Sequence, residues 1–181
     1  MNISKFHNGF KRDGFIGLIN VFLGKIGFKY RFRTSIQSRV KYLEQKLKIL
    51  TKNFVQSGPY KNLKISDDIN WSDHDFNAKI LGVYEQEVQK KLTEWNAQNF
   101  VNLGGAEGYH GLGQLLTKTK KNLYIFEQDA ISRKILKKNS EINNLENQVR
   151  ILNKADENFL DLIKNLNVSL KDTCFLIDVE G

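Results

Sequence analysis

A glycine-rich turn and an acidic residue downstream of it are the features of this sequence whose types and spacing suit chemistry. Residues 102–108 read NLGGAEG, and glycines in such a turn let the backbone approach a ligand closely and adopt dihedral angles that side chains forbid. Glu127 follows about twenty residues later, where an acidic side chain can accept hydrogen bonds from both hydroxyls of a ribose. Together, the turn and the carboxylate predict a site for a nucleoside-containing cofactor.

The turn lacks the patterns that bind phosphate. Counting from Gly104, the third position is Ala106 and the sixth is Tyr109, whereas the dinucleotide fingerprint needs glycine at both. The Gly-Lys-Ser/Thr ending of a phosphate-binding loop is also missing from the turn. A cofactor without phosphate fits better, and we expect S-adenosylmethionine.

The elements that must position these residues alternate in type from residue 99 onward. Short apolar runs predict strands at 100–103, 123–126, 149–152 and 174–179, and helical spacing predicts helices at 109–119, 130–143 and 157–166. Such alternation implies right-handed crossovers and an α/β fold, a Rossmann-like, doubly wound parallel sheet of about four strands. Ligands of these sheets bind at the carboxyl ends of the strands, where the turn and Glu127 fall.

The first third of the chain is strongly basic. Residues 1–64 hold 14 Lys and Arg against Asp13 and Glu44, a net charge of +12, whereas the remaining residues carry −4. Residues 10–33 mix large apolar residues and glycines with flanking Lys and Arg, a composition typical of a segment in a membrane interface. The alternative is a glycine-interrupted helix that packs on the main domain. The apolar run 14–24 is about half of what a membrane-spanning helix needs, so we expect no crossing.

Two further helices are predicted before the sheet. Apolar residues at steps of four and three from Ile36 to Phe54 predict a helix that ends before Gly58-Pro59, and we expect its stripe to pack within the monomer. A short strand at 60–65 and a helix at 76–96 follow. The acidic loop between them, residues 67–75, contains carboxylates crowded in a way that starts helices, so we expect no metal site.

Three regions result from this organisation: a basic, α-helical N-terminal region at 1–58, a linker and lead-in helix at 59–98, and a partial Rossmann-like domain at 99–181. Cys174, the single cysteine, is expected to be a small buried apolar residue. One cysteine forms no internal disulfide, which fits a reducing, cytoplasmic setting.

Four segments in order resemble the class I S-adenosylmethionine-dependent methyltransferases, and most closely their FkbM-like branch. These segments are FVNLGGAEGYHGLGQL, YIFEQD, LKKNSEINNLENQVRILNKA and FLIDVEG, within residues 99–181. The resemblance implies an O-methyltransferase of glycan biosynthesis that acts on a hydroxyl of a sugar or glycan precursor. Complete members continue through further strands, so the resemblance also implies that this chain is C-terminally truncated, the cofactor-binding portion of such an enzyme.

The resemblance implies a role for each matching residue. The methionine portion of the cofactor would be surrounded by Asn102, Gly104, Gly105, Glu107 and Gly108. The ribose would be held by Glu127, and the adenine would lie near Gln128, Asn153 and Ala155. The sulfonium and the substrate would face the catalytic residues Asp178 and Glu180. Asn102 stands where many relatives have Asp, which removes one charge that would attract the ammonium group. Asp178, Glu180 or His110 can serve as the base for a hydroxyl acceptor, although a structural role is expected for His110.

Two other functions remain open. Tyr30, Phe32 and Tyr42 interleave with arginines and lysines, a mixture that binds single-stranded nucleic acid. The chain would then be a basic nucleic-acid-binding protein with a degenerate Rossmann-like domain. The absence of a recognised nucleic-acid motif argues against that partner. The second alternative is an inactive truncated methyltransferase. The leading expectation is a cytoplasmic enzyme that contacts the inner face of a membrane through residues 10–33.

Overall fold

The computed structural model describes residues 3–26, 36–68, 73–117 and 120–179, and divides into two compact units. The first unit is Met1–Leu50 and the second is Thr51–Gly181. The sheet and the predicted site belong to the second unit.

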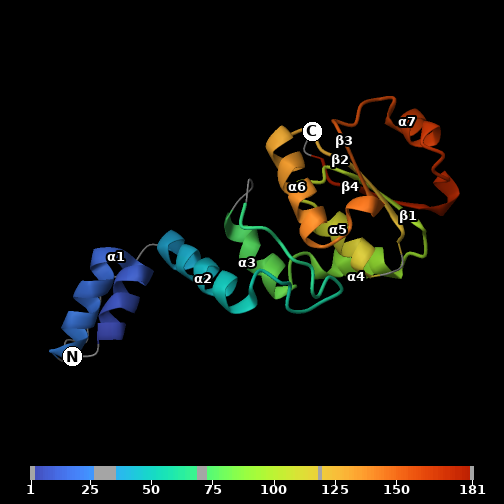
Figure 1. The fold of residues 1–181 in the computed structure, drawn as a ribbon. Helices are drawn as coiled ribbons and strands as arrows, with labels where there is room; N and C mark the ends of the chain where they lie inside the picture. The colour runs from blue at the N-terminus through green and yellow to red at the C-terminus, as the bar shows by residue number, and fades with distance from the viewer. Residues whose placement is uncertain (1–2, 27–35, 69–72, 118–119, 180–181) are drawn as a thin grey trace. The chain divides into compact units, whose positions relative to one another are not determined.

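The second unit is built on a sheet of four parallel strands in the order β3-β2-β1-β4 (Figure 1). The strands are β1 (Asn99–Leu103), β2 (Asn122–Phe126), β3 (Val149–Leu152) and β4 (Thr173–Ile177). All four lie where the apolar runs predict them, and the α/β, Rossmann-like class is confirmed. Because the chain crosses back over β1 and β2 to form β4, the direction of winding reverses between β1 and β4, and open sheets of this kind bind ligands at that switch point.

Helices cover both faces of the sheet, as a doubly wound fold requires. On one face lies α5 (Tyr109–Leu116), so close that a Cβ on its Gly111 would lie 2.8 Å from Ile125 Cδ1. The helix α6 (Ala130–Ile142) follows β2 and contacts β3. On the opposite face, α7 (Phe159–Asn165) places the buried Ile163 in one cluster with Val101 of β1. Cys174 is fully buried in β4, as predicted.

The lead-in to the sheet differs from the prediction. Instead of one helix at 76–96, the chain forms α3 (Asp73–Leu81) and α4 (Gln86–Glu94). The break starts at Gly82, whose φ of +79° favours glycine and where a Cβ would lie 2.0 Å from the carbonyl oxygen of Ser57. The predicted strand at 60–65 is also wrong, because the described residues there form only an isolated antiparallel bridge, Phe54 with Lys64.

The first unit contains two helices. In α1 (Ile3–Lys25) the helical geometry is interrupted at Gly14, which has φ +57°. The helix α2 (Ile36–Thr51) confirms the helix predicted from Ile36 onward. Within the described part of the chain, neither of these nor any other helix has the length and apolar content that spanning a bilayer demands.

Candidate functional site

The glycine-rich turn lies over the carboxyl ends of three neighbouring strands. The backbone N–H groups of Gly104 and Gly105 both donate to the carbonyl oxygen of Phe126, at 2.9 and 3.1 Å, which ties the turn to the end of β2. On the other side, the N–H of Asp178 donates to the carbonyl oxygen of Leu103 at 2.9 Å. The turn therefore lies at the switch point between β1 and β4.

The glycines of the turn are required by packing against the protein itself. A Cβ on Gly104 would lie 1.9 Å from the carbonyl oxygen of Asp178, and one on Gly105 would lie 2.0 Å from Ile125 Cγ2. Gly108 has φ +91°, and its Cβ would lie 2.2 Å from Leu136 Cδ1. The turn is thus held in one shape by its neighbours, independently of a ligand.

Glu127 is a buried carboxylate that spans the turn and the start of α6. Its Oε2 accepts a hydrogen bond from the backbone N–H of Ala106 at 2.7 Å, and its Oε1 accepts one from the N–H of Asp129 at 2.8 Å. A carboxylate has about four acceptor positions, so these two bonds leave capacity on both oxygens. The free acceptor positions can accept hydrogen bonds from the hydroxyls of a ribose.

Asn102 carries a polar atom that no described residue satisfies. The residue is 2% exposed, and its Oδ1 is buried and accepts no hydrogen bond from the described residues. Its place in β1 is in register with Ile125 and Leu176, and alternation along the strand puts its side chain on the face opposite Val101. An unpaired buried carbonyl oxygen costs about 1–3 kcal/mol, which favours a donor from outside the chain at this position.

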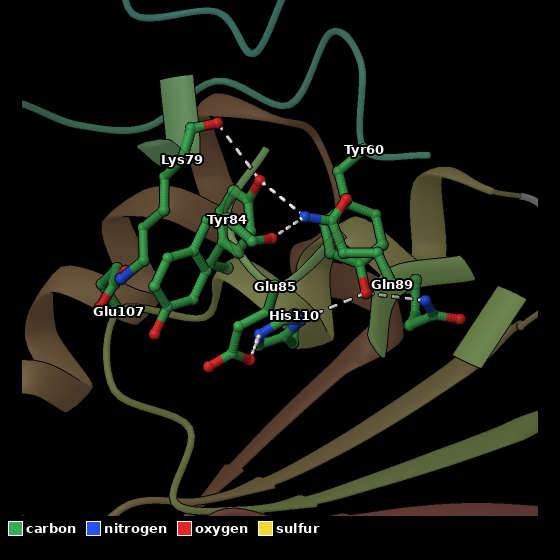
Figure 2. A network of polar contacts seen from close by, with 9 residues as sticks. Tyr60, Lys79, Tyr84, Glu85, Gln89, Glu107 and His110 are labelled. Carbon is green, nitrogen blue, oxygen red and sulfur yellow. Dashed lines mark hydrogen bonds and ion pairs between the residues drawn. The ribbon is translucent and has the colours of Figure 1, made fainter. Parts of the chain in front are cut away.

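Glu107 forms an ion pair that joins the turn to α3. Lys79 Nζ lies 2.5 Å from Glu107 Oε1, and the two side chains are 13% and 14% exposed. The same ammonium lies 4.8 Å from the ring centroid of Tyr84 (Figure 2). It also lies 5.8 Å from the ring centroid of Tyr109. Aromatic faces attract a cation at such distances, so this corner of the site is arranged around a positive charge.

His110 belongs to a chain of hydrogen bonds beside this ion pair. Gln114 Nε2 donates to the hydroxyl of Tyr60 at 2.8 Å, and that hydroxyl lies 3.4 Å from His110 Nδ1. His110 Nε2 lies 2.9 Å from Glu85 Oε2 (Figure 2). All three contacts are satisfied when Tyr60 donates to Nδ1 and Nε2 donates to Glu85.

The protonation of this chain follows from its burial. Burial lowers the pKa of His110, although the carboxylate of Glu85 acts in the opposite direction. The imidazole is therefore neutral at pH 7, with both nitrogens engaged, which leaves it no lone pair for an incoming substrate. Burial likewise raises the pKa of Tyr60 and of Tyr109, so both hydroxyls stay protonated as donors.

The remaining residues expected at the site lie around its edge. Three of these side chains are exposed: Gln128, two residues after the end of β2, Asn153, directly after β3, and Asp178, directly after β4. Burial is the main cause of the raised pKa of Tyr84, and the Asp178 carboxylate adds to it. The ligand roles of these side chains remain predictions.

Two of the expected residues stand apart from the others. Ala155 packs against the apolar cluster on the face covered by α7. Glu180 lies outside the described residues. Asn102, the turn, Glu127 and the backbone of Asp178 are the expected positions that the fold brings together.

Sequence reasoning missed three residues of the site: Lys79, Tyr84 and Glu85. They lie in the segment that helical periodicity assigns to one continuous helix. In such a helix the chain would not turn at Gly82 to bring these side chains to the site. The local signal was Gly82, since a glycine within a helical pattern can mark its end. In the described ranges, no group of three or more His, Cys, Asp or Glu side chains is placed to hold a metal ion.

Neither protein-family models nor curated proteins match this sequence. The chain is similar in structure to the methyltransferase domain of METTL16, with 15% identity, 90% of this chain and 57% of that chain covered, and a TM-score of 0.44. It is similar to TYW2 of M. jannaschii, solved in complex with AdoMet, with 20% identity, 48% and 36% covered, and a TM-score of 0.36. It is also similar to geranyl diphosphate C-methyltransferase from Streptomyces coelicolor, with 12% identity, 62% and 42% covered, and a TM-score of 0.33. The matched region spans less than two thirds of each of these three chains.

Proposed function

We propose that the chain is the cofactor-binding portion of an S-adenosylmethionine-dependent O-methyltransferase. The observation that carries the proposal is the bond between the Glu127 carboxylate, at the end of β2, and the backbone of the glycine-rich turn that follows β1. This bond holds a carboxylate, which would accept hydrogen bonds from ribose hydroxyls, beside a close-packed turn at the switch point of a parallel sheet. The unpaired Oδ1 of Asn102 lies in the strand that leads into that turn.

The residues present fit this cofactor, which when bound supplies a methyl group on a sulfonium. Glu127 would accept from the ribose hydroxyls through the acceptor positions that its two backbone bonds leave open. Asn102 Oδ1 would accept from the ammonium of the methionine portion. The charge at Glu107, already balanced by Lys79, would provide the second contact to that ammonium, while Lys79 would attract the cofactor's carboxylate.

The chain's own part in the reaction is to place the acceptor and to take its proton. Positioning contributes most to such a displacement because the methyl donor already carries a good leaving group. His110 has both nitrogens engaged, so the role of base falls to Asp178, which is exposed beside Gly104, or to Glu180. A carboxylate at either position would accept the proton of a hydroxyl as its oxygen attacks.

The acceptor class rests on the resemblance of the four segments to the FkbM-like branch. We therefore propose a hydroxyl of a sugar or glycan precursor as the methyl acceptor, and a cytoplasmic place of action.

The test is isothermal titration of S-adenosylmethionine and S-adenosylhomocysteine into the 181-residue chain. We expect saturable binding of both, weakened about tenfold or more by Glu127→Gln, because the amide turns one acceptor into a donor. The matched control is Glu146→Gln, an exposed glutamate that should leave the affinity unchanged. Absence of binding by folded wild-type chain, or equal effects of the two variants, would contradict the proposal.

A further inference from the structure

We propose that the N-terminal unit docks the protein on the surface of an anionic lipid bilayer. The proposal concerns Met1–Leu50 and is independent of the cofactor site. It depends on two helices that expose large apolar side chains and on the charge that surrounds them.

Three large apolar side chains are exposed to solvent, two in the described part of α1 and one directly after its end. Phe15, Phe22 and Ile26 are 72%, 56% and 60% exposed. They follow at steps of seven and four residues, which places them on one face. In contrast, Asn20 is 7% exposed and Gly17 is buried. Exposed aromatic side chains beside a buried asparagine differ from the usual pattern of a helix in a water-soluble protein, although Leu18, Ile19, Val21 and Leu23 are half-buried.

The second helix repeats this arrangement. Ile36, Leu43 and Leu50, seven residues apart in α2, are 79%, 53% and 77% exposed. These three positions belong to the apolar stripe predicted from the sequence, and within the first unit they are exposed. Exposed aliphatic rows of this kind mark an interaction surface.

Charge identifies the partner as anionic. The acidic residue of α2, Glu44, is buried and pairs with Lys48 at 2.5 Å, whereas Lys41 and Lys46 are exposed. Residues 1–50 hold 11 Lys and Arg against Asp13 and Glu44, a net charge of +9, so two copies of this unit would repel each other. Nucleic acid would satisfy the charge, but it offers nothing to bury the aliphatic rows. An anionic bilayer surface satisfies both, with apolar side chains among the acyl chains and lysines at the headgroups.

The experiment is co-sedimentation of the 181-residue chain with vesicles of phosphatidylcholine alone and with vesicles containing about a quarter phosphatidylglycerol. We expect binding to the anionic vesicles that is at least about tenfold stronger than to the neutral ones and that high salt weakens. The variant Phe15→Ser/Phe22→Ser should lower partition about tenfold. Its matched control is Leu160→Ser/Leu162→Ser, two exposed leucines of α7, which should bind as the wild type does.

Charge reversal separates the two contributions. Lys41→Glu/Lys46→Glu should lower partition to anionic vesicles about tenfold and leave the weak binding to neutral vesicles unchanged. Circular dichroism of each variant checks that the helices persist. The proposal is overturned if the wild type does not sediment with anionic vesicles. It is also overturned if the Phe15/Phe22 variant and the α7 control behave alike, or if the chain shifts RNA or self-associates without binding vesicles.

Discussion

Replacing Asn102 by leucine should stabilise the free chain and weaken its binding of cofactor. Asn102 is 2% exposed and its Oδ1 has no partner among the described residues. Leucine has a similar shape and no polar atom, and replacing an unpaired buried polar group by an apolar one removes its desolvation penalty. If that oxygen is kept to receive a donor from the cofactor, the two effects must have opposite signs.

The magnitude follows from the cost of the unpaired oxygen. We expect the free energy of unfolding to rise by about 1–2 kcal/mol, which for a unit of this size corresponds to a melting temperature about 3–8 °C higher. Cofactor affinity should fall about tenfold, equivalent to about 1.4 kcal/mol. Trp95 belongs to the second unit, so tryptophan fluorescence can follow the unfolding of that unit, and isothermal titration can measure the affinity.

Asn99 is the matched control, because it has the same type, lies in the same strand and is also buried. Its Nδ2 donates to the carbonyl oxygen of Asp172 at 3.2 Å, and its Oδ1 accepts from Asn122 Nδ2 at 3.0 Å. Asn99→Leu should therefore lower the free energy of unfolding by about 1–3 kcal/mol and leave the affinity unchanged. The reasoning is refuted if Asn102→Leu destabilises the chain as much as Asn99→Leu, or if it leaves cofactor affinity at the wild-type value.

Three further changes test the packing and charges of the site. Gly105→Ala should lower the free energy of unfolding by about 1–3 kcal/mol because its Cβ meets Ile125 Cγ2, and urea denaturation measures this loss. In a chain that already carries Ile125→Ala, the loss caused by Gly105→Ala should be smaller. Lys79→Met should lower it by about 3 kcal/mol by leaving Glu107 mostly buried without its cation, and a double-mutant cycle with Glu107→Gln should show coupling rather than additivity. The lowered pKa of His110 means that the unfolded chain binds a proton first as the pH falls, so the melting temperature should be highest above about pH 6.5 and decline below it. His110→Gln should flatten that decline in melting curves, and an unchanged slope would contradict the assigned direction.

The sequence predicts the sheet well because its signals are local. Each strand is a short apolar run, and the glycine-rich turn and Glu127 both follow such runs, so the winding rule alone brings them to the same edge of the sheet. The four strands and the places of Asn102 and Glu127 needed no knowledge of distant contacts.

The rest of the site depends on contacts between distant segments. Lys79 and Glu107 are 28 residues apart, and Glu85 and His110 are 25 apart. The break that frees Glu85 from a helix is imposed by the close approach of Ser57 to Gly82. The apolar pattern within residues 76–96 holds no information on the contact with Ser57, so that pattern by itself predicts a continuous helix.

The packing of the turn also bears on how lost activity would appear in related sequences. Since Gly104, Gly105 and Gly108 are held by Asp178, Ile125 and Leu136, selection for a stable fold alone would preserve them. A related protein that no longer binds a ligand would keep these glycines, and an alignment would not distinguish it from one that does. Asn102 would be free to drift toward aliphatic residues in such a protein, which makes that single position the better record of whether the ligand is still bound.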